Sequence, residues 1–124
     1  MKTPKISEAE WEVMKVLWAD SPRSAAEVID ALQADDPARH PRTIKTLLAR
    51  LVKKRALAYE KHGRAYQYRP LVRQEECVAA ASDSFLERVF GGSLQPMLAF
   101  FVGRRKLSRR EIEELRRLLD RKED

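Results

Sequence analysis

Lysine and arginine side chains, which neutralise phosphate groups, gather in one stretch of this 124-residue sequence. Residues 39–69 contain ten of them and one acidic residue, Glu60, so this window carries a charge of +9 while the whole chain carries +6. Scattered basic residues usually form a solvated surface, but a concentrated positive charge attracts polyanions. The sequence therefore indicates a nucleic-acid-binding surface in this window. Its basic residues are Arg39, Arg42, Lys45, Arg50, Lys53, Lys54, Arg55, Lys61, Arg64 and Arg69.

The first half of the window has the pattern of an amphipathic helix over residues 41–55. Proline is favoured at the first helical position, and apolar residues recur from Ile44 at i, i+3, i+4, i+7 and i+8. Off this stripe, arginine can read guanine, threonine can meet a phosphate or a thymine methyl, and lysine neutralises phosphate. The alternative is an ordinary solvated face, but the acidic partners usual on such a face are missing from residues 39–58. The groove contacts that we expect are Arg42, Thr43, Lys45, Thr46 and Arg50.

The second half of the window has the pattern of a β-hairpin. Residues 57–61 and 65–69 include three tyrosines, which strands favour, and His62-Gly63-Arg64 joins them as a basic tip. We expect His62 to lie near phosphate there. The other predicted phosphate contacts are Lys53, Lys54, Lys61 and Arg64.

Two further helices are predicted before the window, because Ser-x-x-Glu sequences typical of capping boxes precede two apolar periodic runs. Three helices followed by a hairpin is the order of a winged helix-turn-helix, whose third helix enters the major groove. We therefore expect a mainly α fold in which residues 1–71 form a winged-helix DNA-binding domain. The two helices are predicted over residues 8–19, after Ser7, and over residues 25–34, after Ser24. Their predicted core residues are Trp11, Met14, Leu17 and Trp18, and Val28, Ile29 and Leu32.

Residues 72–124 are predicted to form three more helices and a dimerisation domain. The helices are expected over residues 72–90, 94–102, capped by Ser93, and 109–122, preceded by a capping box at Ser108. The middle one is apolar almost all round and must be buried, but about 50 residues make too small a core to bury it. A second copy of the chain would supply the missing cover; the alternative is packing against the N-terminal part. The interface residues that we expect are Phe85, Leu86, Val89, Leu94, Leu98, Phe101, Val102, Ile112, Leu115 and Leu119.

Several classes of protein are excluded by what the sequence lacks. It has no Gly-rich phosphate loop, no His-Glu-x-x-His and no nucleophile elbow, so we do not expect an enzyme. Two histidines and the single Cys77 are too few for a metal site, no cofactor is expected, and Cys77 is interpreted as a packing residue rather than a redox switch. The longest uncharged stretch, residues 89–103, is too short to span a membrane, and no signal peptide is recognised. We therefore expect a cytoplasmic protein without membrane insertion.

Three motifs together identify a family resemblance. Residues 6–18 (ISEAEWEVMKVLW), 43–51 (TIKTLLARL) and 66–68 (YQY) resemble the BlaI/MecI/CopY family of penicillinase and methicillin-resistance repressors, and the resemblance extends over almost the whole chain. It implies a homodimeric winged-helix repressor on a palindromic operator, with a β-lactamase or another resistance or stress gene under its control. In that family a membrane sensor-protease commonly relieves repression.

The sequence departs from the family at three places. Arg55 stands where members often have a glycine after the Lys-Lys that ends the third helix, a position that favours a left-handed backbone. Phe100-Phe101 stands where the β-lactam repressors are cut between Asn and Phe. The C-terminal cysteine cluster of the copper-responsive relatives is missing. A different class of function also remains, that of a winged-helix adaptor which binds proteins and reads no DNA sequence.

Overall fold

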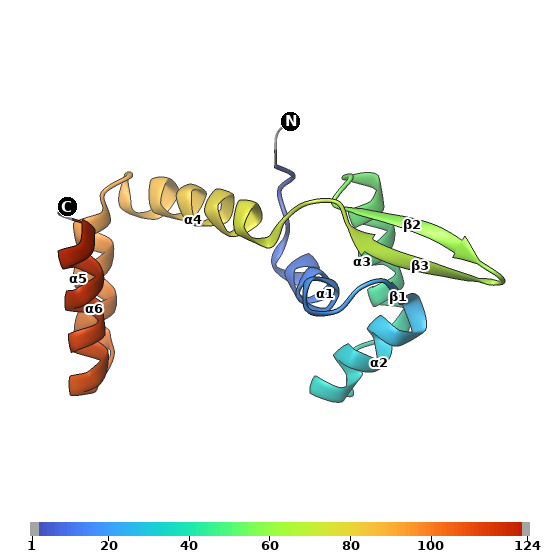
Figure 1. The fold of residues 1–124 in the computed structure, drawn as a ribbon, viewed down its shortest axis with the longest axis horizontal. Helices are drawn as coiled ribbons and strands as arrows, with labels where there is room; N and C mark the ends of the chain where they lie inside the picture. Colours follow the sequence, from blue (N-terminus) through green and yellow to red (C-terminus); the bar gives the residue numbers. More distant parts are fainter. Residues whose placement is uncertain (1–2, 123–124) are drawn as a thin grey trace. The chain divides into compact units, whose positions relative to one another are not determined.

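Three helices and a β-hairpin open the chain in the computed structural model, which describes residues 3–122, and three helices close it (Figure 1). This order confirms the predicted mainly α fold with a winged helix-turn-helix. The chain divides into two compact units, which we call the N-terminal unit, ending at Ser82, and the C-terminal unit, beginning at Asp83. The elements are α1 (Glu8–Ala19), β1 (Arg23–Ser24), α2 (Ala25–Asp35), α3 (Pro41–Lys53), β2 (Leu57–His62), β3 (Ala65–Pro70), α4 (Gln74–Phe90), α5 (Leu94–Arg104) and α6 (Arg109–Lys122).

Capping boxes begin three of the helices, as predicted. At α1, Ser7 Oγ accepts a hydrogen bond from the N–H of Glu10 at 3.2 Å, and Glu10 Oε1 accepts one from the N–H of Ser7 at 2.8 Å. These bonds satisfy amide groups that a helix start leaves without partners. Ser93 occupies the N-cap position of α5, as predicted, but its side chain makes no capping hydrogen bond. The reciprocal pair recurs at α2 between Ser24 and Glu27, and at α6 between Ser108 and Glu111.

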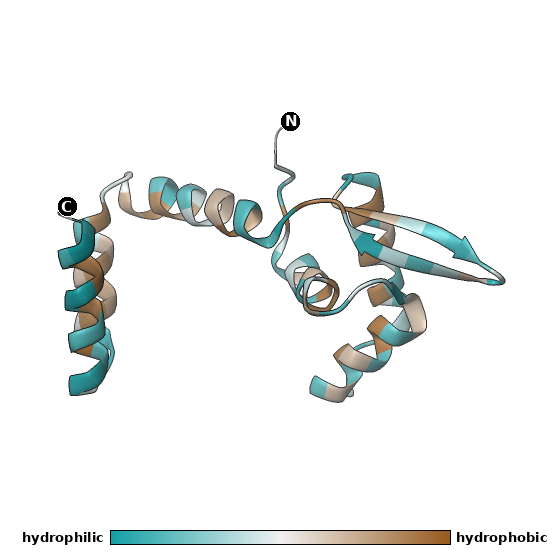
Figure 2. Cartoon of the chain, viewed as in Figure 1, coloured by the Kyte–Doolittle hydropathy of each residue, from teal (hydrophilic) through white to brown (hydrophobic). Residues whose placement is uncertain are grey.

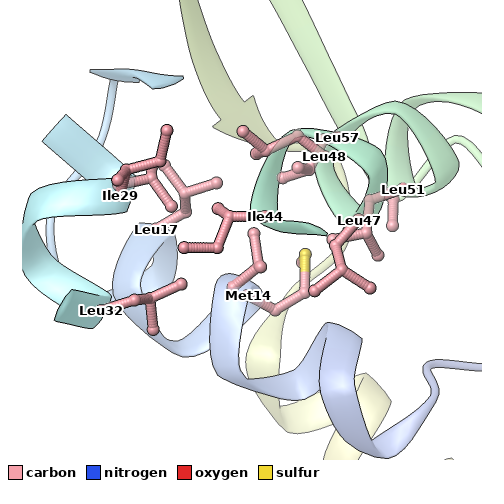
Figure 3. Close-up of a cluster of buried hydrophobic side chains, with 12 residues drawn as sticks. Met14, Leu17, Ile29, Leu32, Ile44, Leu47, Leu48, Leu51 and Leu57 are labelled. Atoms are coloured by element: carbon pink, nitrogen blue, oxygen red, sulfur yellow. The ribbon is translucent and has the colours of Figure 1, made fainter. Parts of the chain in front are cut away.

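One hydrophobic core holds the N-terminal unit together, and side chains from α1, α2, α3 and β2 point toward one another in it (Figure 3). Burying a leucine or methionine contributes about 1.5–3 kcal/mol relative to leaving it exposed. Trp11 and Trp18 were predicted in this core but are only half-buried, and Val13 takes the inner position on α1. The core residues are Val13, Met14, Leu17, Val28, Ile29, Leu32, Ile44, Leu47, Leu48, Leu51, Ala56 and Leu57.

The two tryptophans form a pair at the edge of this core. Their ring centroids lie 5.5 Å apart, and Trp18 Nε1 donates a hydrogen bond to the carbonyl oxygen of Val72 at 2.9 Å. A buried indole N–H needs such a partner, which favours a place at the rim over the centre of the core. The bond also ties α1 to the segment that leads into α4.

A three-stranded antiparallel sheet of order β1-β3-β2 forms the wing. β2 and β3 pair along their whole length, with Tyr59 opposite Tyr68, and Arg23 of β1 pairs with Tyr68 on the other edge. β1 was not predicted, because two residues are too few to show the alternation that identifies a strand. It anchors the start of α2 to the base of the hairpin.

The third helix ends at Lys53, two residues earlier than predicted, in a Schellman motif. The N–H of Ala56 donates to the carbonyl of Leu51 at 2.9 Å, and the N–H of Arg55 donates to that of Val52 at 3.0 Å. Arg55 has a φ of 65°. The left-handed conformation expected at this position is therefore confirmed. Arg55 adopts it with the steric penalty of a Cβ, which a glycine would not have.

The start of α4 belongs to the N-terminal unit, and the rest of the helix belongs to the C-terminal unit. Cys77, in its first turn, is 2% exposed, and burial raises the pKa of its thiol. A buried thiol of this kind is unreactive, in agreement with a packing role. The predicted domain boundary between residues 71 and 72 lies just before α4 and stays a prediction.

The C-terminal unit has no buried residue in α5 or α6. Figure 2 shows apolar residues along α4, α5 and α6, and more than half of Leu94 and Leu119 is exposed. Four phenylalanines gather within the unit, with Phe85 and Phe90 at 5.9 Å and Phe100 and Phe101 at 5.7 Å between ring centroids. Of the helices in residues 3–122, none is long and apolar enough to cross a membrane.

Candidate nucleic-acid interface

α3 has two faces of opposite character. Its buried stripe rests on α1 and α2, and the opposite face points to solvent. The structure therefore brings the predicted groove residues together on one exposed surface. Among the described residues, this surface also lacks any acidic side chain in the first turn of α3. The exposed residues of α3 that were predicted to contact DNA are Arg42, Thr43, Lys45, Thr46, Arg50 and Lys53.

The N-terminus of α3 is capped by a histidine. His40 Nδ1 accepts a hydrogen bond from the N–H of Arg42 at 3.1 Å, and Pro41 occupies the first helical position. The remaining amides and the positive end of the helix dipole favour an anion beside Arg42. One helical turn later, Thr46 Oγ1 donates to the carbonyl of Arg42 at 3.0 Å. Its proton is therefore used within the helix, and Thr46 can offer DNA a lone pair or its methyl group.

The structure divides the ten basic residues of the window into two groups. Arg39 and Lys54 form ion pairs with carboxylates, whereas the other eight have no ion-pair partner within residues 3–122. Lys54 was predicted as a phosphate contact, but its ammonium lies 2.5 Å from Glu10 Oε1. The assignment of Lys54 to a DNA phosphate stays a prediction, and Glu10 competes with the phosphate for the same ammonium group. The eight cations left for DNA are Arg42, Lys45, Arg50, Lys53, Arg55, Lys61, Arg64 and Arg69.

The wing adds a basic tip and an aromatic surface. Gly63 turns the chain at a φ of 65° between His62 and Arg64, both exposed. Behind the tip, Tyr59 and Tyr66 are 49% and 44% exposed and pack edge to face at 4.8 Å between centroids. Sequence reasoning used these tyrosines only as strand formers, although their position beside arginine and lysine could have indicated binding. Their rings are apolar surfaces that can lie against deoxyribose, with hydroxyls that reach phosphate.

A groove of about 1030 Å³ lies between α1 and the N-terminal half of α3, with Trp11 and Thr43 among its lining residues. The charges on its rim balance one another. A hydrogen bond from Lys15 and a smaller contribution from a hydrogen bond from Arg39 lower the pKa of Glu12 below its ordinary value. No three metal-ligating side chains come together within residues 3–122. The positive surface of the N-terminal unit is therefore the exposed face of α3 and the wing rather than this groove.

Comparison with protein families finds one that spans nearly the whole chain. A model described as "Penicillinase repressor" matches residues 6–121. The chain is 41% identical over 119 residues to the penicillinase repressor of Bacillus licheniformis, covering 96% of this chain and 92% of that protein. It is 37% identical over 121 residues to the methicillin resistance regulatory protein MecI of Staphylococcus aureus, covering 98% of both.

Two solved structures are similar to about three fifths of the chain. The DNA-binding domain of the repressor BlaI, solved in solution, has a TM-score of 0.54 and 44% identity, covering 61% of this chain and 93% of that one. The monomeric form of Bacillus licheniformis BlaI in complex with the blaP half-operator has a TM-score of 0.51 and 43% identity, covering 60% and 90%.

Proposed function

Because this chain belongs to the penicillinase repressor family and is a DNA-binding repressor, we propose that it acts as a homodimer on an operator with two half-sites and controls a β-lactam-resistance gene. The observation that carries the proposal is the exposed, cationic face of α3 beside a basic wing. A relative of this chain has been solved on a half-operator, and a half-operator is what one copy of a dimer would occupy.

The proposed contacts follow from the chemistry of each side chain. Arg42 and Arg50 have forked guanidinium groups that fit guanine edges in the major groove. Thr43 and Thr46 are suited to phosphate or thymine methyl groups. The proposed phosphate contacts are Lys45 and Lys53 on α3 and Lys61, His62 and Arg64 on the wing.

The proposed dimer rests on the C-terminal unit. Its apolar side chains remain open in a single copy, and isolated helices that expose such faces gain stability by pairing. Two identical helical units can cover one another by a twofold axis, which places two α3 helices on half-sites about 34 Å, or a multiple of it, apart. The proposed interface comprises Phe85, Leu86, Val89, Leu94, Leu98, Phe101, Val102, Ile112, Leu115 and Leu119.

The family resemblance adds the proposal that a membrane sensor-protease cuts the repressor and so releases it from its operator. Such a protease would have to accept Phe100 in the position of the asparagine at the family's cleavage bond. Incubating the repressor with membranes that contain the sensor, with and without a β-lactam, would test this by the appearance of two fragments. An intact chain under both conditions would reject proteolytic release.

Operator binding can be tested by fluorescence anisotropy of labelled duplexes from upstream of the repressor's own gene, with scrambled duplexes as controls, at several salt concentrations. We expect one duplex to bind at least about 10³-fold more tightly than scrambled DNA, with affinity that falls steeply as salt rises. Equal, weak binding to every duplex would reject an operator in that region. No binding even at low salt would favour the protein-interaction adaptor.

A pair of variants separates base reading from charge. Arg50→Ala is expected to weaken operator binding by about 1–3 kcal/mol and scrambled binding much less. Lys53→Ala is the matched control, because an exposed lysine one turn away should weaken both about equally. Equal losses for Arg50→Ala would reassign that arginine to phosphate.

A further inference from the structure

Two basic residues flank the recognition helix α3, and both are bound to carboxylates of α1. Arg39 immediately precedes the N-cap residue of α3, and Lys54 is its C-cap residue. Their partners on α1 are Glu12 and Glu10. We propose that these two ion pairs, which we call the α1 clamp, position the recognition helix for base reading, and that Lys54 serves this purpose instead of binding a DNA phosphate. This inference rests on the proposed function.

The pair at the C-terminal end of α3 is the tighter one. Glu10 is 1% exposed, and its Oε1 receives hydrogen bonds from Lys54 Nζ at 2.5 Å and from the N–H of Ser7 at 2.8 Å. Lys54 Nζ also donates to the carbonyl of Lys5 at 2.9 Å. Two of the three ammonium donors are therefore used within the chain.

The charge state of Glu10 fits this arrangement. Burial alone would raise the pKa of Glu10, but hydrogen bonds from Lys54 and Ser7 lower it below its ordinary value. The carboxylate is thus ionised at neutral pH in a place where water cannot solvate it. Moving Lys54 away to a phosphate would leave this buried charge without its counterion, which is strongly unfavourable.

The pair at the N-terminal end joins α1 to the connection between α2 and α3. Arg39 Nη2 lies 3.4 Å from Glu12 Oε1, and the guanidinium also lies 3.8 Å from carboxylate oxygens of both Asp35 and Asp36. The carbonyl of Arg39 accepts a hydrogen bond from Gln33 Nε2 at 3.0 Å. The residue before the cap of α3 is therefore fixed on several sides.

Glu10 and Glu12 project from nearly opposite sides of α1, because two residues turn an α-helix by about 200°. Each can therefore reach a different end of α3. Apolar packing tolerates small sliding and rotation of one helix on another, whereas directional ion pairs of the kind seen here fix a register. Base reading needs side chains placed to within about 0.5 Å, so a loosened α3 should lose preference for its operator before it loses affinity for DNA in general.

The decisive experiment compares neighbouring lysines. In anisotropy measurements on operator and scrambled duplexes, Lys53→Met should reduce the slope of log affinity against log salt by about 0.9 for each phosphate that is no longer neutralised, hence about 1.8 for a dimer. The double variant Glu10→Gln/Lys54→Met removes both charges of the pair without leaving one buried alone. It should keep the wild-type slope but lower the ratio of operator to scrambled affinity about tenfold, the effect of removing one good bidentate pairing with a base.

A fall in slope for the double variant equal to that of Lys53→Met would overturn the proposal and make Lys54 a phosphate contact. An unchanged ratio in the folded double variant would also overturn it, because a pair that only stabilises the fold would leave specificity intact. Lys54→Arg, which keeps the charge, should retain most of the wild-type ratio, and its failure to do so would count against the clamp.

A measurement without DNA separates this inference from the proposed function. The unfolding free energies of Glu10→Gln, Lys54→Met and the double variant should be non-additive if the two side chains interact. Additive effects would overturn the clamp whatever the protein binds. Absence of operator binding by the wild-type protein would instead overturn the proposed function.

Discussion

The two units of this chain bury apolar side chains in different ways. The N-terminal unit closes twelve residues from α1, α2, α3, β2 and the turn before β2 into its own core, whereas α5 and α6 of the C-terminal unit bury none. The C-terminal unit is nevertheless rich in leucine and phenylalanine. The first unit therefore buries its core within one copy, while the second unit leaves apolar side chains exposed.

This difference matches two requirements of a repressor. A surface that reads bases must be rigid in each copy, and the core beneath α3 together with the clamp on its ends supplies that rigidity. An assembly surface must instead be open until a partner arrives. Substitutions in the core of the first unit are therefore expected to change stability within each copy, and substitutions on the apolar surface of the second unit are expected to act through association.

The largest effect is expected in the core beneath α3. Leu48 is 1% exposed, and Leu48→Ala should lower the free energy of unfolding by about 2–5 kcal/mol because it removes buried methyl groups and leaves a cavity. Urea unfolding followed by circular dichroism at two protein concentrations measures this loss. The loss should be the same at both concentrations, and a loss that shrinks as concentration rises would contradict a self-sufficient first unit.

A smaller effect, of a different kind, is expected on α6. Leu119 is 58% exposed in one copy, so Leu119→Asp costs the single chain little, but it should weaken dimerisation at least about 100-fold, or about 2.7 kcal/mol, by placing a charge in an apolar interface. Sedimentation equilibrium measures the dissociation constant. Glu113→Gln, on the same helix, is the control and should leave it nearly unchanged. Unaltered association of Leu119→Asp would remove α6 from the interface.

The smallest effect sharpens the comparison within the first unit. Arg55→Gly should raise the free energy of unfolding by about 1 kcal/mol, because glycine adopts the left-handed conformation at this position without the penalty of a Cβ. Urea unfolding against wild type measures the gain. The same variant should lose a cation close to the DNA-facing surface and bind scrambled DNA less tightly. A variant less stable than wild type would show that the arginine side chain makes a favourable contact in the fold.

Local signals predicted most of the fold. Capping boxes, the proline at the start of α3 and the spacing of apolar residues are read within one turn of helix, and the helices began where these signals placed them or within two residues. β1 was missed because its pairing with β3 depends on tertiary packing. The end of α3 was predicted two residues late because Lys54 caps the helix before the left-handed residue at position 55.

The sequence predicted which residues form the candidate site, but it did not predict which of its cations are paired with carboxylates within the chain. The exposed face of α3 follows from helical periodicity alone. The α1 partners of Arg39 and Lys54 could not be predicted, because Glu12 lies 27 residues from Arg39 and Glu10 lies 44 residues from Lys54. Charge counted along a sequence shows how many cations a segment has, but only the fold shows which of them are already neutralised.

The tryptophan pair on α1 has a practical consequence for spectroscopy. Both tryptophans and all three tyrosines of the chain lie in the N-terminal unit, and all four phenylalanines lie in the C-terminal unit. Intrinsic tryptophan emission therefore reports on the first unit alone, and the 5.5 Å spacing of the two indoles makes that emission sensitive to the packing of α1. The native protein thus carries a built-in optical label for the unit that contains α3 and the wing.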